Sequence, residues 1–573
     1  MGEEDLLNRI NVFPVADGDT GTNLALTARA MINVLQNSTN MAIGDSLTEL
    51  ADAALDGCRG NSGVILAQFL HGLSDAAGGQ TRLDPHRWVE SVGIAVKYAR
   101  DAIEYPREGT MLTIFEVLHT RSQQLLSEQP AAGYERLMAE LSVSLEDALQ
   151  ATKTQLDVLA KANVVDAGAA GIVAIIQGVN NLLQGEEVSA LPDMGAAALT
   201  TGAQNNADET YRFCTECIVA GDGLDHRRLR ESLAEHGNSM VIAGGPKRLK
   251  LHIHCDTPDT VFSIAAEFGN VSGEKADDMT RQATALQSKA GVAVITDSAG
   301  DLPQHEADRL NIHLVPLRVH IGEHSYLDKV SLSFDELYQK VSASDDSLRT
   351  SQPPPGDFRR MFEYLDSHFD AVVSVQLTDK VSGTLQAARS AADRLDSSHG
   401  VRVVNSLNIS LGQGLLTLAA AEAAAAGLSA DDIVASLKRL IPKTRTFGIV
   451  TDLSYAVRGG RVPPSRKLLA DFLHVTPVLY SDPQGNVKTN RILWGRDRLV
   501  EKFARHVARR CDSQQEYRIA VGHGSDPDQA QQLLALLLAK IPNVGKHYIT
   551  EVGAALGVHG GPGILVAAVQ PME

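Results

Sequence analysis

The amino-acid sequence predicts a multidomain protein with an all-α N-terminal domain, a small α+β middle domain and a C-terminal α/β domain. Its 573 residues are too many for a single hydrophobic core. Apolar residues recur at three- and four-residue spacing through the first third of the chain, as on one face of a helix. After about residue 290, short apolar runs of strand length alternate with helical stretches. These patterns predict domains at 1–190, 210–288 and 290–573, with a linker at 191–209.

The all-α prediction rests on a series of amphipathic segments with little strand-like alternation between them. The clearest of these segments are Val64–Leu70, Met111–Leu118, Leu137–Leu149 and Ile172–Leu183. Between Glu186 and Asp208 the composition changes to Ala, Gly, Thr and Asn with few large apolar residues, which is typical of a linker.

Strands and helices alternate in the rest of the chain. In the middle domain we predict strands Phe213–Val219, Ser239–Ile242 and Leu249–His254 and helices Leu224–His236 and Thr257–Phe268. In the last domain we predict strands Val292–Thr296, Ala371–Val375, Val401–Val404 and Arg518–Val521 and helices Pro355–Ser367 and Ser429–Leu440. Short buried strands separated by helices indicate a largely parallel sheet.

Composition and charge exclude several classes of protein. A formal net charge of -18 argues against broad nucleic-acid binding, which needs a cationic surface, although local anion sites are compatible with it. The 5 cysteines are irregularly spaced, which predicts no disulfide framework and a reducing compartment. The acidic start of the chain predicts no secretory signal. The most apolar helical run, Leu415–Leu428, contains Glu422 and is too short to span a bilayer, so we expect a cytoplasmic protein.

The segment Asn11–Asn23, which reads NVFPVADGDTGTN, carries the most specific chemistry. Asp17 and Asp19 are separated by one glycine after a proline-containing turn, so both carboxylates can be directed at one point. Mg²⁺ favours one or two carboxylates together with phosphate and water oxygens. The residues Thr20–Asn23 then open a helix, whose first N–H groups favour anions. The alternative interpretation is a solvated Asp-Gly-Asp turn.

Three further loops of glycine and small polar residues each precede a predicted helix. They are Gly57–Gly63, Glu108–Met111 and Asp166–Gly171. A single loop of this kind is more simply a helix cap, whereas four in one helical domain favour helix N-termini that converge on one phosphate-rich ligand. The pattern G-x-x-x-x-G-K-[ST] is absent from the sequence, so a nucleotide would be held without the lysine of that loop.

In order along the chain, NVFPVADGDTGTN, GCRGNSGVIL, EGTMLT and VVDAGAAG resemble the DhaL-type ATP-binding domain of dihydroxyacetone kinases and bacterial fatty acid kinase. The resemblance covers roughly residues 5–190 and implies an eight-helix barrel that binds ATP. It implies Asp17 and Asp19 as catalytic Mg²⁺ ligands and leaves Asn11 open as a further metal-site residue. The residues that it places at the nucleotide are Thr20, Thr22, Asn23, Asn61, Ser62, Gly63, Thr110, Met111, Asp166 and Gly168. Members of that family usually have an additional helix before the first motif, and this chain begins almost at the motif.

The middle domain contains one thiol and two imidazoles with a spacing that suits a metal. His252 and His254 alternate along a predicted strand and so lie on one of its faces, and Cys214 lies on another predicted strand. One Cys and two His form an adequate zinc set, with a fourth position open or filled by another group. The alternative is two ordinary surface histidines and a buried cysteine. The Cys-Thr-Glu and His-x-His strands resemble the middle domain of fatty acid kinase, which supports the interpretation as a structural Zn²⁺ site.

Several loops of the C-terminal domain combine small residues with a hydroxyl, guanidinium or imidazole group. Thr296–Ser298 follows the first strand, where α/β sheets present ligand groups. The other loops contribute Thr350, Ser351, Ser382, Gly383, Thr384, Arg461 and His559. Converging hydroxyls and a cation suit a carboxylate, which accepts several hydrogen bonds at once. Each loop alone is more simply a turn or a cap.

In order, VITDS, TSQP, SGT, GGR and HGGPG resemble the DegV family of fatty-acid-binding proteins over about Val292 to Val569. The resemblance implies two α/β lobes with an acyl chain between them. It places Thr350, Ser382, Arg461 and His559 at the carboxylate end of that chain, with Ser351, Gly383 and Thr384 beside them. Two positions depart from the family pattern. Asn405-Ser406 stands where members often have Asp-Ser, and Val475–Pro477 lacks a common lysine.

Together these resemblances imply an ATP- and Mg²⁺-dependent fatty acid kinase that carries its own fatty-acid-binding domain. It would phosphorylate a fatty-acid carboxylate, and the acyl-phosphate would feed an acyltransferase of phospholipid synthesis. One alternative is a lipid-binding regulatory protein with a silent kinase domain, against which Asp17, Asp19 and Ser62 argue. The other is a small-polyol kinase of the dihydroxyacetone type, whose substrate domain has no matching segment in this chain. A homodimer stays open, as do the length and saturation of the acyl chain.

Overall fold

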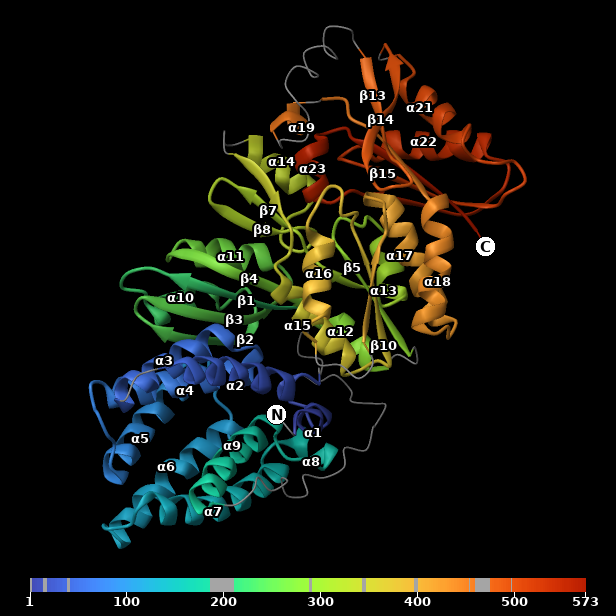
Figure 1. The fold of residues 1–573 in the computed structure, drawn as a ribbon. Coiled ribbons are helices and arrows are strands. Elements are labelled where there is room, and N and C mark those ends of the chain that lie inside the picture. Colours follow the sequence, from blue (N-terminus) through green and yellow to red (C-terminus); the bar gives the residue numbers. More distant parts are fainter. Residues whose placement is uncertain are drawn as a thin grey trace. The chain divides into compact units, whose positions relative to one another are not determined.

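The computed structural model describes residues 3–13, 18–38, 42–185, 211–287, 291–342, 347–395, 400–452, 454–458, 475–495 and 497–572. The chain divides into two compact units, Met1–Leu286 and Gln287–Glu573 (Figure 1). The linker predicted at 191–209 lies outside the described residues.

The first unit begins with a helical domain, as the apolar spacing predicted. Its helices are α1 (Glu4–Arg9), α2 (Thr20–Asn37), α3 (Ile43–Gly57), α4 (Gly60–Ala77), α5 (Pro85–Asp101), α6 (Met111–Glu128), α7 (Tyr134–Gln155), α8 (Asp157–Ala162) and α9 (Ala167–Gln184). One hydrophobic core receives side chains from all of these helices. Phe69 of α4 stacks on Phe115 of α6, with ring centroids 4.1 Å apart. This shared core holds the starts of the helices in fixed relation to one another.

The middle domain is an antiparallel four-stranded sheet of order β2-β3-β1-β4. Its elements are β1 (Phe213–Ala220), α10 (His226–Leu233), β2 (Asn238–Gly245), β3 (Arg248–Cys255), α11 (Pro258–Ala266), β4 (Asn270–Asp278) and α12 (Met279–Gln287). Strand β4 was not predicted because its sequence, NVSGEKADD, is polar on both faces. β2 adds Val241 and Ala243 to the core of the helical domain, and Gly244 N–H donates to Gln68 Oε1 of α4 at 2.6 Å. The helical and middle domains therefore form one packed body.

The second unit contains a parallel sheet of order β11-β10-β5-β6 and a small antiparallel sheet of order β8-β7-β9. The strands are β5 (Val292–Asp297), β6 (His313–Val315), β7 (Arg318–Ile321), β8 (His324–Leu327), β9 (Leu348–Ser351), β10 (Ala371–Gln376) and β11 (Val401–Asn405). The helices are α13 (Gln304–Arg309), α14 (Phe334–Ser342), α15 (Pro355–Asp366), α16 (Thr384–Ala392), α17 (Ser410–Ala425) and α18 (Ala430–Leu440). The predicted parallel sheet is confirmed for this half of the unit.

The other half of the second unit is built on a six-stranded sheet of order β14-β13-β12-β17-β15-β16. Its elements are η1 (Ile441–Lys443), β12 (Arg445–Ile449), α19 (Ser454–Arg458), β13 (Val475–Ser481), β14 (Val487–Trp494), α21 (Leu499–Ala508), β15 (Tyr517–His523), α22 (Pro527–Lys540), β16 (Val544–Glu551), α23 (Ala554–Gly560) and β17 (Leu565–Pro571). Among its described strands, β15 and β16 alone pair in parallel, so the prediction of a largely parallel sheet is wrong here. A short buried apolar run has the same pattern between parallel and antiparallel neighbours, so periodicity could not distinguish them.

The most apolar run of the sequence forms a helix buried in the interior of the second unit. α17 is buried along most of its length, and its side chains pack in a core that also contains residues of both large sheets. A helix that is apolar all round is typical of a protein interior. Within the described part of the chain, no helix combines the length and the apolar character that crossing a membrane requires.

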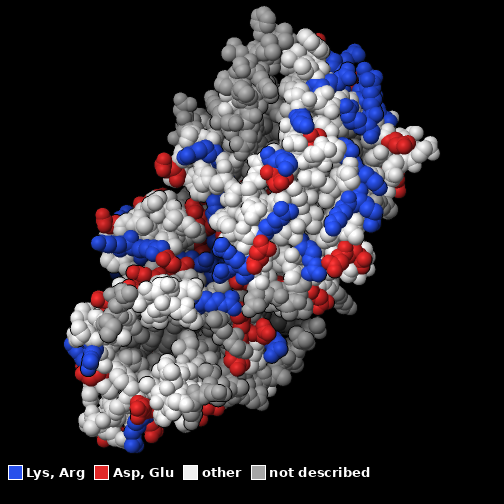
Figure 2. Space-filling model, viewed as in Figure 1, with Lys and Arg blue, Asp and Glu red and all other residues white. Residues whose placement is uncertain are grey.

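Lys and Arg side chains gather over β14 and α21 on the face shown in Figure 2. β14 is an edge strand of its sheet, and Lys488 and Arg491 on it are exposed together with Ile492 and Trp494. Charged side chains on an edge strand oppose its pairing with the sheet of another molecule. This edge is therefore protected against edge-to-edge association.

The stacked pair Phe69–Phe115 generates a test of the shared core. Phe115→Ala removes a buried ring, and we expect the free energy of unfolding of the first unit to fall by about 3–5 kcal/mol. Denaturant unfolding can be followed through Trp88 in a Trp494→Phe background, because the chain has 2 tryptophans and one lies in each unit. The control Val143→Ala changes a side chain that is 64% exposed and should shift stability by less than about 0.5 kcal/mol. Equal effects of the two substitutions would contradict the shared core.

Candidate functional site

The loop predicted to hold magnesium leads directly into α2. Asp19 immediately precedes the helix, which begins at Thr20, whereas Asp17 lies outside the described residues. Thr22 N–H donates to Asn8 Oδ1 at 3.1 Å, and Asn8 Nδ2 donates to Thr22 Oγ1 at 2.9 Å. Thr22 therefore ties α2 to α1, a structural role that the sequence did not indicate. Its contact with a nucleotide stays a prediction.

Four helices of the domain begin beside one another. Gly60 at the start of α4 has φ +56°, and a Cβ atom there would clash with Asn23 Nδ2 of α2. A Cβ atom at Gly168 of α9 would lie 3.3 Å from Ser62 Oγ of α4 and 3.5 Å from Met111 Sδ of α6. The starts of α2, α4, α6 and α9 therefore converge, which is the arrangement that the four loops predicted. Because the first N–H groups of a helix have no partner within it, this region can bind an anion such as phosphate.

Other residues predicted at the nucleotide have different local partners. Thr110 Oγ1 accepts Leu112 N–H at 3.3 Å and so caps α6. Gly63 packs against α2, since a Cβ atom there would lie 2.9 Å from Thr27 Oγ1. Asn61 Oδ1 is buried and accepts no hydrogen bond from the described residues. The Asn61 amide therefore offers a ligand an acceptor that the described protein groups leave unused.

Asp166 caps α9 with its side chain. Its Oδ1 accepts Ala169 N–H at 2.7 Å. Burial raises the pKa of Asp166 to about 7, although the backbone N–H groups of Ala169 and Met111 act in the opposite direction. A substantial share of this carboxyl group is therefore protonated near neutral pH. A neutral acid adds no repulsion to an anion bound beside it.

The thiol and two imidazoles predicted to bind zinc lie together on the middle-domain sheet. Cys214 on β1 and His252 and His254 on β3 place their ligand atoms within 4.8 Å of one another. His252 Nε2 and His254 Nε2 are 3.3 Å apart, and Cys214 Sγ is 3.8 Å from His252 Nδ1. Burial lowers the pKa of His254 to about 3 and raises the pKa of Cys214 well above its usual value. A neutral imidazole is ready to bind a metal, whereas the thiol would release its proton on binding, so the donor set suits Zn²⁺.

Glu216 on β1 is a buried carboxylate that was not among the predicted site residues. Its oxygens lie 3.1 Å from Lys250 Nζ, 3.7 Å from Lys275 Nζ and 3.3 Å from His252 Nδ1. Burial alone would raise the pKa of Glu216, but the two lysines and His252 hold it well below its usual value. Because side chains alternate along a strand, Glu216 shares one face of β1 with Cys214. The Cys-x-Glu spacing was the signal that could have identified it.

The Glu216 carboxylate also reaches the helical domain. Gly60 N–H, at the start of α4, donates to Glu216 Oε1 at 2.9 Å. Burial is the main cause that raises the pKa of Cys214, and the negative charges of Glu216, Asp277 and Asp19 raise it further. Since Asp19 acts on Cys214 across the domain boundary, the predicted magnesium loop and the Cys–His cluster are neighbours.

In the second unit, three of the predicted loops meet. Thr350 Oγ1 of β9 and His559 Nε2 of α23 are 3.0 Å apart. The loop before α16 packs against the loop after β9, since a Cβ atom at Gly383 would clash with Gln352 Oε1. Residues that are 209 positions apart in the chain therefore form one group.

Further hydroxyl groups lie in the same loops. Ser382 Oγ and Thr384 Oγ1 are 2.8 Å apart. Ser351 Oγ is 2.9 Å from His320 Nε2 of β7, a histidine that was not predicted. Arg461 lies outside the described residues. The hydroxyl and imidazole groups of these loops can donate hydrogen bonds to an acceptor such as a carboxylate.

The Thr296–Ser298 motif was expected to present ligand groups, but it belongs to the interior. All three residues are fully buried. Thr296 Oγ1 donates to the Val375 carbonyl at 2.8 Å, and Ser298 Oγ donates to Asp328 Oδ2 at 2.6 Å. The prediction is wrong because these groups bond within the protein and none is exposed at the end of the strand.

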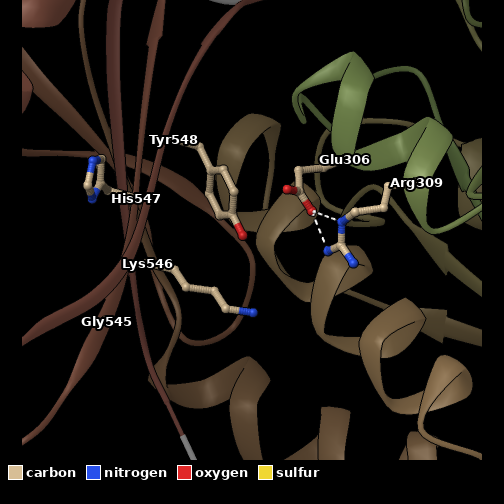
Figure 3. A pocket seen from close by; sticks show the side chains of 6 residues that line it. All are labelled: Glu306, Arg309, Gly545, Lys546, His547 and Tyr548. Carbon is tan, nitrogen blue, oxygen red and sulfur yellow. Dashed lines mark hydrogen bonds and ion pairs between the residues drawn. The ribbon is translucent and has the colours of Figure 1, made fainter.

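A cavity of about 430 Å³ in the second unit lies between α13 and β16 (Figure 3). It is lined by Glu306, Arg309, Gly545, Lys546, His547 and Tyr548. The Arg309 guanidinium donates twice to Glu306 Oε2, at 3.1 and 2.6 Å. This polar lining does not suit a hydrocarbon chain, and it shares no residue with the predicted carboxylate end.

Three families match the chain in the order of its parts. Residues 14–181 match the DAK2 domain, and residues 210–286 match the middle domain of proteins that are like fatty acid kinase. Residues 291–571 match the DegV family, whose model is described as that of an uncharacterised protein.

Individual relatives match about half of the chain. Protein DegV of Bacillus subtilis is 30% identical over 275 residues, which cover 48% of this chain and 97% of that protein. An uncharacterised protein of Staphylococcus saprophyticus is 31% identical over 307 residues, which cover 51% of this chain and 55% of that protein. This chain therefore spans about half the length of that relative. A solved structure from Thermus thermophilus, titled as fatty acid binding of a DegV family protein, is 29% identical and covers 49% of this chain and 99% of its own, with a TM-score of 0.45.

The raised pKa of Asp166 predicts that stability depends on pH. This pKa is about 7 in the folded protein against an ordinary value of 3.8, so between these values the folded state binds more protons than the unfolded state. The free energy of unfolding should fall as the pH rises from about 4 to about 7, by at most about 1.4 kcal/mol per pH unit from this group. Asp166→Asn should abolish this contribution, because an amide does not titrate but still caps a helix.

Denaturant unfolding of the nucleotide-free protein at several pH values checks this expectation. Asp147→Asn is the control, because it makes the same chemical change at an exposed position of the same domain. Equal pH slopes for Asp166→Asn and the wild type would contradict the raised pKa.

Proposed function

Because this chain belongs to the DegV family, we propose that it binds a fatty acid and phosphorylates the fatty-acid carboxylate with ATP and Mg²⁺ in its helical domain. A DAK2 domain, a middle domain like that of fatty acid kinase and a DegV domain follow one another in a single chain. This order supports a fatty acid as the substrate of the kinase domain. The structural observation that carries the proposal is the convergence of four helix N-termini close to Asp19.

The residues at the converging helices suit a magnesium nucleotide. The first N–H groups of α2, α4, α6 and α9 are donors for phosphate oxygens. Asp17 and Asp19 would hold Mg²⁺, which when bound neutralises charge on the phosphates. The buried Asn61 Oδ1 is an acceptor suited to a metal ion or to a donor group of the ligand. The other residues proposed around the nucleotide are Thr20, Thr22, Asn23, Ser62, Gly63, Thr110, Met111, Asp166 and Gly168.

The proposed reaction is an in-line transfer of the γ-phosphoryl group. An oxygen of the fatty-acid carboxylate forms a bond to the γ-phosphorus while the bond from that phosphorus to the β-phosphate oxygen breaks, giving acyl-phosphate and ADP. The carboxylate is already anionic at neutral pH, so no strong base is needed. The N–H groups at the helix starts stabilise the charge on the transferred oxygens. Acyl-phosphate is an activated acyl donor, so the enzyme that consumes it must be an acyltransferase.

The DegV domain would hold the acidic end of the lipid at its converging loops. The hydroxyl groups of these loops and the His559 ring can each donate a hydrogen bond to a carboxylate. The residues proposed for this contact are Thr350, Ser351, Ser382, Gly383, Thr384, Arg461 and His559. Because both modules belong to one chain, presentation of the carboxylate is intramolecular, which raises its effective concentration at the kinase domain wherever the linkers allow the approach.

We also propose that Cys214, His252 and His254 bind Zn²⁺. The lowered pKa of His254 keeps that ring neutral, as a metal ligand must be. Three protein ligands leave a fourth tetrahedral position for water or for an oxygen of a bound molecule. Because the charge of Asp19 acts on Cys214, that fourth position belongs to the same region as the magnesium loop.

Trapping of acyl-phosphate tests the proposed reaction. The full chain incubated with oleate, ATP and Mg²⁺ should form a product that hydroxylamine converts to the acyl hydroxamate. Asp17→Ala and Asp19→Ala should each slow its formation at least about 100-fold, because a metal ion contributes several kcal/mol to transition-state stabilisation. The exposed carboxylate variant Asp147→Ala should form hydroxamate at the wild-type rate.

Two other outcomes would assign a different function. Bound lipid without ATP turnover in the wild type would identify a lipid-binding protein with a silent kinase domain. Phosphorylation of glycerone but not of oleate would identify a small-polyol kinase.

Removal of one hydroxyl group tests the proposed carboxylate end. Thr350→Val keeps the shape of the side chain but removes the group that contacts His559. We expect the Kd for oleate to rise roughly 10- to 100-fold, because a hydrogen bond to a charged group contributes about 1.5–3 kcal/mol. Displacement of a fluorescent fatty acid measures this Kd, with the exposed substitution Thr489→Val as the matched control. An unchanged Kd in Thr350→Val would remove these loops from the carboxylate site.

A further inference from the structure

We propose that Glu216 is a positioning residue that couples metal binding at Cys214, His252 and His254 to phosphate binding at the start of α4. The inference rests on the proposed function, since it takes the start of α4 as part of a phosphate site. One carboxylate oxygen, Glu216 Oε1, contacts both His252 of the middle domain and Gly60 of the helical domain.

The first contact determines which nitrogen of His252 can bind a metal. An ionised carboxylate accepts hydrogen bonds and cannot donate them, so at 3.3 Å His252 Nδ1 carries the proton and donates it to Glu216 Oε1. His252 Nε2 is then unprotonated, and it faces His254 Nε2 at 3.3 Å. Two nitrogens at about 2.0–2.1 Å from a tetrahedral ion would lie about 3.3–3.4 Å apart, so the rings already have the spacing of a zinc site. Carboxylates behind metal-binding histidines fix the ring in this way.

The second contact sets the first turn of α4. Gly60 N–H donates to Glu216 Oε1 at 2.9 Å. Gly60 has φ +56°, and a Cβ atom there would clash with Asn23, so the position requires glycine. The N–H groups that follow, beginning with that of Asn61, are the donors left for an anion. A shift of Glu216 would therefore move the donors that we expect to hold phosphate.

Two buried lysines allow an acidic side chain at this place. Lys250 Nζ is 3.1 Å from Glu216 Oε2 and Lys275 Nζ is 3.7 Å from Glu216 Oε1, and these lysine side chains are only 4% and 9% exposed. Asp277 lies 2.8 Å from Lys275 Nζ and balances the second positive charge. The four side chains together are neutral, so Glu216 adds no net repulsion toward a phosphate. The lysines also hold the carboxylate in one position.

These contacts predict a positive coupling between metal and nucleotide. A metal ion that orders His252 also orders Glu216 and the first turn of α4, so a nucleotide that binds afterwards has less freedom to remove. Thermodynamic linkage requires the same factor in both directions. We expect Zn²⁺ to tighten nucleotide binding by about 5- to 150-fold, and the nucleotide to tighten Zn²⁺ binding by the same factor.

The experiment uses the full chain after removal of metal with a chelator. A fluorescent, non-hydrolysable ATP analogue with Mg²⁺ is titrated with and without Zn²⁺, and Zn²⁺ affinity is measured against a chromogenic chelator with and without the analogue. In Glu216→Gln the coupling factor should fall to about 1, and Zn²⁺ affinity should drop about 10- to 100-fold. No fatty acid or turnover is needed, so the result is separate from the activity of the enzyme.

Two further variants keep the test decisive if Glu216→Gln destabilises the fold by leaving both lysines without their carboxylate. Gly60→Ala leaves the buried charges intact but displaces the Gly60 N–H, so it should abolish coupling while Zn²⁺ affinity without the nucleotide stays at the wild-type value. Asp56→Asn is the matched control, because Asp56 pairs with Arg248 across the same domain boundary without contacting Glu216. This control should keep the wild-type coupling factor.

The possible results separate the two proposals. Binding of both ligands without coupling in the wild type, or wild-type coupling in Glu216→Gln or Gly60→Ala, would overturn the role of Glu216 and leave the kinase proposal standing. Failure of the wild type to bind the nucleotide at all would overturn both. Coupling that disappears in Glu216→Gln and Gly60→Ala but persists in Asp56→Asn would support the inference.

Discussion

The first unit depends on one electrostatic constraint, which is that four helices begin at the same place. Each helix start carries unpaired N–H groups and a partial positive charge, so bringing four of them together is unfavourable without acceptors. Side chains supply some of these acceptors: Thr110 caps α6, Asp166 caps α9 and Glu216 takes Gly60 N–H. The remaining N–H groups define where an anion is stabilised. The requirement that these groups be paired thus locates the site before any ligand is considered.

The middle domain extends this constraint by placing an ionised carboxylate in a buried position. Buried ion pairs contribute little to stability compared with apolar side chains of similar size, because desolvation offsets their attraction. A group of Glu216, Lys250 and Lys275 is therefore poorly explained as a stabilising device alone. Its contacts with His252 and Gly60 give a better account, because they relate two binding regions that lie in different domains. The shared core of the two domains makes such a relation mechanically possible.

The sequence predicted the features that are encoded locally and missed those that depend on partners distant in the chain. Glycine-rich loops before apolar-periodic segments identified the starts of α4, α6 and α9, because a helix start has its own composition. The spacing of His252 and His254 identified a shared strand face for the same reason. By contrast, the contact of Glu216 with Gly60 joins residues 156 positions apart, and no local pattern encodes it. Strand β4 and the antiparallel pairing of the second large sheet were missed because polar strands and short apolar runs do not specify their neighbours.

The wrong interpretation of Thr296–Ser298 shows how an interior motif can still serve a binding site. Ser298 donates to Asp328, and Asp328 Oδ1 accepts Ala555 N–H at 3.0 Å, in the first turn of the helix that carries His559. The motif therefore acts on the proposed carboxylate site through α23 and not by contact with a ligand. Precise hydrogen bonding to a substrate requires that the donor itself be held in place by the groups behind it. A conspicuous polar motif at a strand end can thus mark the support of a site, while the residues that face the ligand come from loops far along the chain.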